Sequence, residues 1–446
     1  MAEEKLVRGI DRWSMVAIVI NSIIGAGIFG LPSKVAALIG SYSLIAFVIC
    51  TVIIAFVVVC FAEVSSRFTE TGGPYLYAKE AYGSLFGFEV GWLMWIARVT
   101  TFAANCNLLL AYLGFFVPHA NEGTLRIVLA SSVVLIITAV NYVGVRQSAM
   151  MTNILTVGKI VPLIVFAAVG LFFIQPANFT LPAAPDNATF ASAILILIYA
   201  FVGWESTTTV AGEMKDPQRN LPFALLTGLA FAAVLYLLIQ IVCIGTLPEL
   251  SKSERPLVDA ANNFFGAFAA SFITLGALVS ILGNINGGFL FASRAPFAMA
   301  EQNELPQILA KTHSKFKTPY VSILLTAAVM LVFTIWSSFI AALTISTIAR
   351  LIVYVTTCAA LPILRQRKDL PKAVFTAPFD VMASVLALGL TIWLLSYVDY
   401  KKEGLAVLIL AAVGLAIYFV YKILGTNGKK AVAEQVDALR VSKLTN

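Results

Sequence analysis

Four ionisable side chains stand inside long apolar stretches of this 446-residue chain: Arg98, Lys159, Glu205 and Arg350. A charged group in such a place costs about 2.5–3.5 kcal/mol on membrane-insertion scales unless it faces a polar cavity or a partner. Residues of this kind bind charged solutes, carry protons or pair with one another. Glu205 is the one acid among the four, and Arg98 and Arg350 are both candidates for its partner. Sequence spacing does not decide between them.

Glycines interrupt two of the apolar stretches at matching places. The first contains IGAGIFGLP from Ile24 onward, and the sixth contains FVGWEST from Phe201 onward. Each glycine weakens a helix by about 0.8–1 kcal/mol relative to alanine. Gly25 lies twelve residues after the start of its stretch and Gly203 twelve residues after Ala191, which is about 18 Å of helix in each case. Both interruptions therefore fall at a similar depth.

The elements that position these residues follow from composition. The chain is 60% hydrophobic and 12% charged, whereas a soluble domain carries about 25% charged residues. A polytopic membrane protein is predicted, and most soluble enzyme classes are excluded. An apolar stretch of about 20 residues crosses the hydrocarbon core. Twelve such spans are predicted, at 13–39, 41–66, 85–117, 126–145, 150–174, 190–211, 222–246, 267–299, 319–337, 339–363, 380–398 and 404–424.

The basic residues orient these spans. With the N-terminus inside, 20 of the 30 lysines and arginines fall in inner segments and five in outer loops. This asymmetry follows the positive-inside rule with both termini cytoplasmic. The net charge of +7 thus reflects topology, and no nucleic-acid partner is expected. The outer connection 247–266 is read either as a short helix that could act as a lid or as a plain surface loop.

In this topology the first and sixth spans enter the membrane from opposite faces. Two helices broken at a similar depth and running in opposite directions are typical of an inverted repeat with a binding site where the breaks meet. Freed N–H groups at the start of a half-helix suit a carboxylate, and freed carbonyls suit an ammonium. Amino acids carry both groups. GAGIFG by itself favours close helix packing through small residues, but the matched second break favours a binding site.

Four motifs then resemble a known superfamily. SIIGAGIFGLP, AEVSSRFTETGGPYLYAKEAYG, YAFVGWESTTTVAGEMKDPQRNLP and NGGFLFASRAPFAMAEQNELP are similar to segments of the amino acid–polyamine–organocation (APC) transporters, over residues 10–365. The resemblance implies an all-α LeuT-type fold of ten core helices in a 5+5 inverted repeat plus two further helices. Helices 1 and 6 would be discontinuous, and transport would proceed by alternating access.

The resemblance also implies a substrate site. The carboxylate would lie on the first break and the amino group on carbonyls of the sixth span, with Tyr199 as an aromatic gate. Many relatives have serine where this chain has Ala26, so backbone N–H groups alone would hold the carboxylate. The expected substrate-binding residues are Ile24, Gly25, Ala26, Gly27, Ile28, Tyr199, Phe201, Val202, Gly203 and Glu205.

Lys159 and Glu205 are the expected coupling residues. In sodium-independent relatives a lysine on span five occupies the place of the coupling ion, and Lys159 matches it. It would serve as a structural cation, as a proton-coupling site or as an ordinary interhelical hydrogen-bond donor. Glu205 follows the break in span six, as in agmatine–arginine antiporters. It would accept a proton, or it would brace the unwound turn through N–H groups or an arginine.

The sequence predicts neither catalytic nor metal-binding residues and no cofactor. It contains no HExxH, GxSxG or P-loop motif, and its five cysteines form no CxxC pair. An ion channel is the rival class, but channel filters usually come from repeated rings of carbonyls or carboxylates.

The predicted function is sodium-independent transport of amino acids across the plasma membrane, by proton symport or by exchange. Neutral L-amino acids are preferred, because Tyr199, Phe201 and Trp204 would form an aromatic wall and the arginines disfavour a cationic side chain. A cationic amino acid or polyamine held through Glu205 is the alternative. A monomer or homo-oligomer in the lipid bilayer, without an obligatory heavy chain, is expected. The predicted segments are a cytoplasmic tail 1–12, a transport core 13–363 with repeats 13–174 and 190–363, two added spans in 380–424 and a cytoplasmic tail 425–446.

Overall fold

The computed structural model describes residues 10–69, 72–143, 145–378 and 381–423, and for 145–157, 210, 212 and 213 it describes the backbone alone. The predicted tails, apart from residues 10–12, lie outside the described residues. Within the described part of the chain the regular structure is helical, and a single isolated bridge joins Ile10 to Met214.

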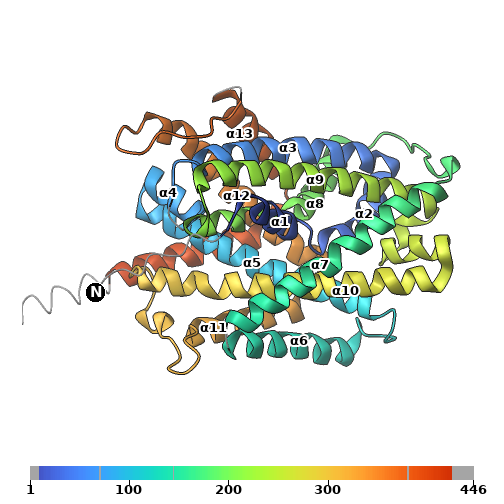
Figure 1. The fold of residues 1–446 in the computed structure, drawn as a ribbon, viewed down its shortest axis with the longest axis horizontal. Helices are drawn as coiled ribbons and strands as arrows, with labels where there is room; N and C mark the ends of the chain where they lie inside the picture. The colour runs from blue at the N-terminus through green and yellow to red at the C-terminus, as the bar shows by residue number, and fades with distance from the viewer. Residues whose placement is uncertain (1–9, 70–71, 144, 379–380, 424–446) are drawn as a thin grey trace, which may run out of the picture.

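Long helices lie side by side along the longest axis of the molecule, and the short helix α1 lies at the centre of the bundle (Figure 1). α3 and α9 pack together on one side of α1, and α6 and α11 pack together on the other. The helices are α1 (Arg12–Ile23), α2 (Gly27–Ile39), α3 (Ser43–Ser65), α4 (Pro74–Tyr82), α5 (Ser84–Leu113), α6 (Gly123–Val143), α7 (Val145–Gly170), α8 (Asn187–Ile198), α9 (Pro217–Thr246), α10 (Pro256–Glu301), α11 (Tyr320–Trp336), α12 (Phe339–Gln366), α13 (Val381–Ser396) and a last helix at Tyr400–Ile423.

The outer surface of the bundle is apolar. Large hydrophobic side chains such as Leu135, Val234 and Phe268 are exposed on the helices, which is the arrangement expected where lipid takes the place of water. Helices satisfy their own backbone groups and so tolerate that environment. Seven helices among the described residues are long and apolar enough to cross a membrane, and five shorter helices are also apolar. The chain is therefore an all-α, polytopic membrane protein.

Both glycine-containing stretches interrupt the helices at the places where the sequence suggests a break. α1 ends at Ile23 and α2 begins at Gly27. α8 ends at Ile198 and is followed by one 3-10 turn; Val202 is then extended, and Gly203 has φ +114°. A 3-10 segment from Trp204 to Glu213 completes this region.

The two interruptions touch each other. A Cβ atom on Gly203 would lie 2.2 Å from the carbonyl oxygen of Ser22, and a Cβ on Gly27 would lie 2.8 Å from Cα of Ala200. Both distances are shorter than van der Waals contact, so only glycine lets the two segments of the backbone approach this closely. Gly203 also needs its positive φ, a conformation that costs other residues free energy.

The connection before the eighth span contains a short helix. α10 starts at Pro256, and its backbone leaves helical geometry at Phe265 and at Gly266, where φ is +62°. Of the two readings that the sequence left open for 247–266, a short helix is the one observed.

A buried ion cluster joins α3 to the end of α12. The carboxylate of Glu63 accepts two hydrogen bonds from Arg365, at 2.7 and 2.6 Å, and a third from Arg67 at 3.3 Å. The backbone N–H of Ala377 donates a fourth, at 2.8 Å. Because Glu63 has no solvent exposure, this carboxylate is paired as a buried charge must be, and it fixes the packing of two helices distant in sequence.

Candidate functional site

A cavity of about 110 Å³ lies where the two interruptions meet. The first break supplies one wall, and residues around Gly203 supply a second. α5 and α12 contribute polar side chains, and α10 contributes a face of mostly small residues. The lining consists of Asn21, Ser22, Ile23, Gly25, Ala26, Gly27, Arg98, Thr101, Tyr199, Val202, Gly203, Ser206, Gly283, Asn284, Gly287, Gly288, Phe291 and Arg350.

The structure brings together part of the set of site residues that the sequence suggested. Those that line the cavity are Gly25, Ala26, Gly27, Tyr199, Val202 and Gly203. Ile24, Ile28, Phe201 and Glu205 lie within two residues of them in the chain, but they are not part of the lining, and neither is Lys159.

The aromatic wall expected from Tyr199, Phe201 and Trp204 does not form. Phe201 packs edge-on against Phe47 and Tyr236, and the indole of Trp204 stacks on a tyrosine of α12 instead of facing the cavity. Tyr199 alone lines the cavity. Its hydroxyl donates to Oδ1 of Asn105 at 2.6 Å, and its ring packs against Phe339.

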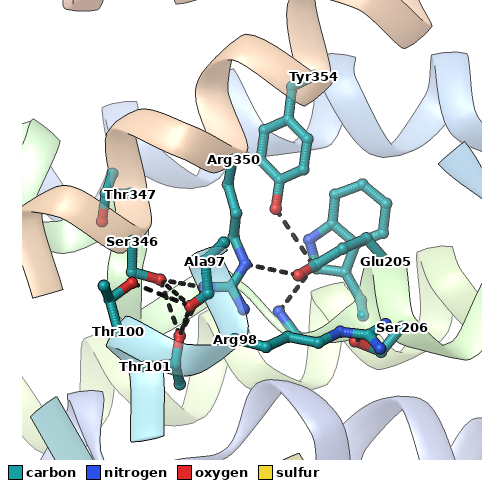
Figure 2. Close-up of polar contacts among 12 residues, drawn as sticks. Ala97, Arg98, Thr100, Thr101, Glu205, Ser206, Ser346, Thr347, Arg350 and Tyr354 are labelled. Carbon is teal, nitrogen blue, oxygen red and sulfur yellow. Dashed lines mark hydrogen bonds and ion pairs between the residues drawn. The ribbon is translucent and has the colours of Figure 1, made fainter. Parts of the chain in front are cut away.

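Glu205 pairs with Arg350 and with the unwound turn (Figure 2). Nε of Arg350 donates to Oε1 of Glu205 at 2.7 Å, while Oε2 accepts from the backbone N–H of Gly203 at 2.7 Å and from the Tyr354 hydroxyl at 3.2 Å. Glu205 and Arg350 are both buried. The geometry therefore selects Arg350 as the ion-pair partner, and the carboxylate braces the turn that contains Gly203.

A second nitrogen of the Arg350 guanidinium also forms hydrogen bonds. Its Nη1 donates to Oγ1 of Thr101 at 2.9 Å and to Oγ of Ser346 at 2.6 Å. Ser346 donates in turn to the carbonyl of Ala97 at 2.8 Å. Figure 2 shows this network joining α12 to α5, and Thr101 and Arg350 also line the cavity.

Arg98 forms no ion pair within the described part of the chain. Nη1 donates to the carbonyl oxygen of Phe291 at 3.1 Å and Nη2 to Oγ of Ser206 at 3.3 Å, and both acceptors are neutral. Its Nε is buried without a hydrogen-bond partner. Arg98 is partly buried whereas Arg350 is buried, and both side chains line the cavity.

Lys159 holds the broken end of α1. Its ammonium donates to the carbonyl oxygens of Asn21 at 2.6 Å and Ile24 at 2.7 Å. The last carbonyls of a helix have no partner inside the helix and carry its negative dipole end. A third one, from Ile23, accepts a hydrogen bond from the Tyr236 hydroxyl at 3.0 Å. Side chains of α7 and α9 therefore replace the helical hydrogen bonds lost at the break.

Sequence reasoning missed several residues of the site. Asn284 packs directly against Gly25, since its Nδ2 lies 2.1 Å from the place of a Cβ there. The sequence did offer a hint, because two asparagines and two glycines interrupt the apolar run NINGG on the eighth span. Tyr236 and Tyr354 give no such hint, because a tyrosine in an apolar span is ordinarily a packing residue.

Two broken helices that meet at a cavity are typical of membrane carriers of small solutes. Sequence comparison identifies the kind of carrier. The chain belongs to the amino acid permease family, whose sequence model matches residues 10–426. It is therefore a membrane transporter of amino acids.

Three relatives from Bacillus subtilis (strain 168) illustrate the range of this similarity. The chain is 28% identical to a methylthioribose transporter, with 94% of each chain covered. It is 29% identical to the serine/threonine exchanger SteT, with 91% of this chain and 94% of the relative covered. It is 26% identical to the branched-chain amino acid permease BcaP, again with 94% of each chain covered.

Proposed function

We propose that this chain is a sodium-independent carrier that moves neutral α-amino acids across the plasma membrane by alternating access. The proposal includes twelve spans with both termini cytoplasmic, arranged as repeats 13–174 and 190–363 with two added spans in 380–424. The membership of the chain in the amino acid permease family and the distribution of its basic residues support this arrangement.

The observation that carries the proposal is the contact between the two interruptions at the edge of the cavity. α2 starts at Gly27 without a side-chain cap, so N–H groups at its start are available to a carboxylate. On the other break, the carbonyl of Val202 would accept from an ammonium, whereas that of Gly203 already accepts the N–H of Ser206 at 3.0 Å. One zwitterion can bind both ends only where the two breaks are adjacent, as they are here.

The charges near the cavity favour a substrate without a cationic side chain. The alternative of a cationic amino acid or polyamine relies on Glu205 as the acceptor. However, Glu205 already accepts three hydrogen bonds and is paired with Arg350. The names of two relatives, a serine/threonine exchanger and a branched-chain permease, also favour neutral amino acids.

Lys159 supports independence from sodium. Its ammonium places a fixed positive charge on the broken end of α1, where a bound cation would otherwise bind the same carbonyls. Glu205 and Lys159 stay the proposed coupling residues for proton symport. Exchange without net proton movement is the second mode, in which both charges are structural.

The test is uptake of a panel of radiolabelled L-amino acids and polyamines into proteoliposomes. Each is measured with an inward proton gradient, with sodium, and with internal unlabelled amino acid. Uptake of neutral amino acids that does not depend on sodium is the expected result. Strict dependence on sodium, or uptake of polyamines alone, would contradict the proposal. Stimulation by protons indicates symport, and stimulation only by internal amino acid indicates exchange.

A further inference from the structure

The cavity is lined by a guanidinium, that of Arg98, which has no ion-pair partner in the described part of the chain. Among the described residues near the breaks there are three cations, Arg98, Lys159 and Arg350, and one carboxylate, Glu205. Arg350 is neutralised by Glu205, and Lys159 is held by the carbonyl end of α1. Arg98 is therefore left with neutral acceptors only.

Arg98 is also placed to meet a substrate. Figure 2 shows Arg350 directed at Glu205, whereas the side chain of Arg98 runs to Ser206. Two of its N–H groups are used, and Nε lies buried with no acceptor. A guanidinium matches a carboxylate with two parallel hydrogen bonds. Nη1 and Nη2 of Arg98 each carry a second N–H beyond the one that Phe291 or Ser206 accepts, and a carboxylate in the cavity would accept from this pair.

The position of Arg98 corresponds to the side-chain end of a bound amino acid. If the two breaks hold the α-carboxylate and α-amino groups, the walls left for the side chain come from α5, α10 and α12. On α10 this wall includes Gly287 and Gly288, and a Cβ on Gly288 would meet open space. The subsite is thus roomy and contains one unbalanced guanidinium.

We propose that the carrier also takes acidic L-amino acids, aspartate or glutamate, whose side-chain carboxylate binds the guanidinium of Arg98. This inference rests on the proposed function of the same site, and it extends the substrate range from neutral to acidic amino acids. Arg98 then acts as a specificity residue that attracts a side-chain anion and repels a side-chain cation.

The experiment compares each acid with its amide, which has nearly the same shape. Proteoliposomes take up a labelled neutral amino acid while L-aspartate, L-asparagine, L-glutamate and L-glutamine compete. In the wild type at least one acid should compete more strongly than its amide. In Arg98→Gln the affinity for the acid should fall at least about 30-fold more than that for the amide, as for loss of one partner of a buried charge pair. Arg98→Lys keeps the positive charge but loses the paired N–H groups of the guanidinium. Its preference for the acid over the amide should therefore lie between those of the wild type and Arg98→Gln.

Arg294→Gln is the matched control, because Arg294 lies on α10 outside the cavity lining and bonds within its own helix to the carbonyl of Leu290 at 2.6 Å. It should keep the wild-type preference. A wild type that does not prefer either acid, or an Arg98→Gln variant that loses acid and amide equally, would overturn the inference. If Arg98→Gln does not fold, Arg98→Lys and thermal stabilisation of the wild type by each acid and amide decide the question. Absence of uptake for every amino acid would instead contradict the proposed function.

Discussion

Replacing Lys159 with methionine tests the support of the broken first helix most directly. Methionine keeps most of the length and the apolar stem of lysine but has no ammonium. The variant leaves the carbonyl oxygens of Asn21 and Ile24 without the hydrogen bonds at 2.6 and 2.7 Å that they now accept. Lys159 is 2% exposed, so bulk water does not reach the place that its ammonium would leave.

The size of the effect follows from two opposing terms. Each buried carbonyl left unsatisfied costs about 1–3 kcal/mol, which gives about 2–6 kcal/mol for the pair. The variant recovers the cost of burying an ammonium, and that recovery offsets part of the loss. We therefore expect a net destabilisation of about 2 kcal/mol, near the lower end of the range.

Thermal unfolding of the purified carrier in detergent and uptake by proteoliposomes both report the change. Lys159→Met should lower the unfolding temperature and reduce uptake, because α1 then loses its fixed position beside the cavity. Lys34→Met is the matched control, since Lys34 lies on α2 and donates no hydrogen bond within the described part of the chain. If Lys159→Met unfolds at the temperature of the control and transports normally, water satisfies the two carbonyls and the reasoning is refuted.

Three further substitutions follow from the same geometry. Gly203→Ala should destabilise the carrier by about 2–4 kcal/mol and abolish uptake, because it adds a Cβ at positive φ and against the carbonyl of Ser22; normal unfolding and uptake would contradict the contact between the breaks. Glu205→Gln should lower stability by about 3–5 kcal/mol by leaving Arg350 unpaired, whereas a stable variant that transports without proton dependence would assign Glu205 to coupling. Gly288→Val should fold normally, since its Cβ meets open space, and should reduce uptake of large amino acids before small ones; an equal loss for every substrate would argue against its place in the side-chain subsite.

Composition and the positions of the glycines determined the fold class of this protein and the places where its helices break. A chain with 12% charged residues and repeated apolar stretches has to fold as membrane helices, because only helices and closed barrels satisfy the backbone in lipid. The helix interruptions at Ile24–Ala26 and at Val202–Gly203 could also be predicted from the sequence. Helix weakening by glycine is a local property of the chain, so neighbouring residues suffice to predict it.

The direction of the side chains around the breaks was decided only by tertiary structure. The sequence could not choose between Arg98 and Arg350 as the partner of Glu205, because 107 and 145 residues separate these arginines from it. Packing of α12 beside the sixth-span break makes Arg350 the partner of Glu205, whereas Arg98 lines the cavity with neutral acceptors in the described part of the chain.

The prediction of an aromatic wall was wrong for the same reason. Tyr199, Phe201 and Trp204 are close in the chain, but the extended Val202 and the positive φ of Gly203 turn the backbone between them. Phe201 and Trp204 are therefore buried against α3, α9 and α12, and only Tyr199 faces the cavity. Local propensity indicates where a helix breaks, whereas the direction of each side chain after the break depends on which distant helices pack against it.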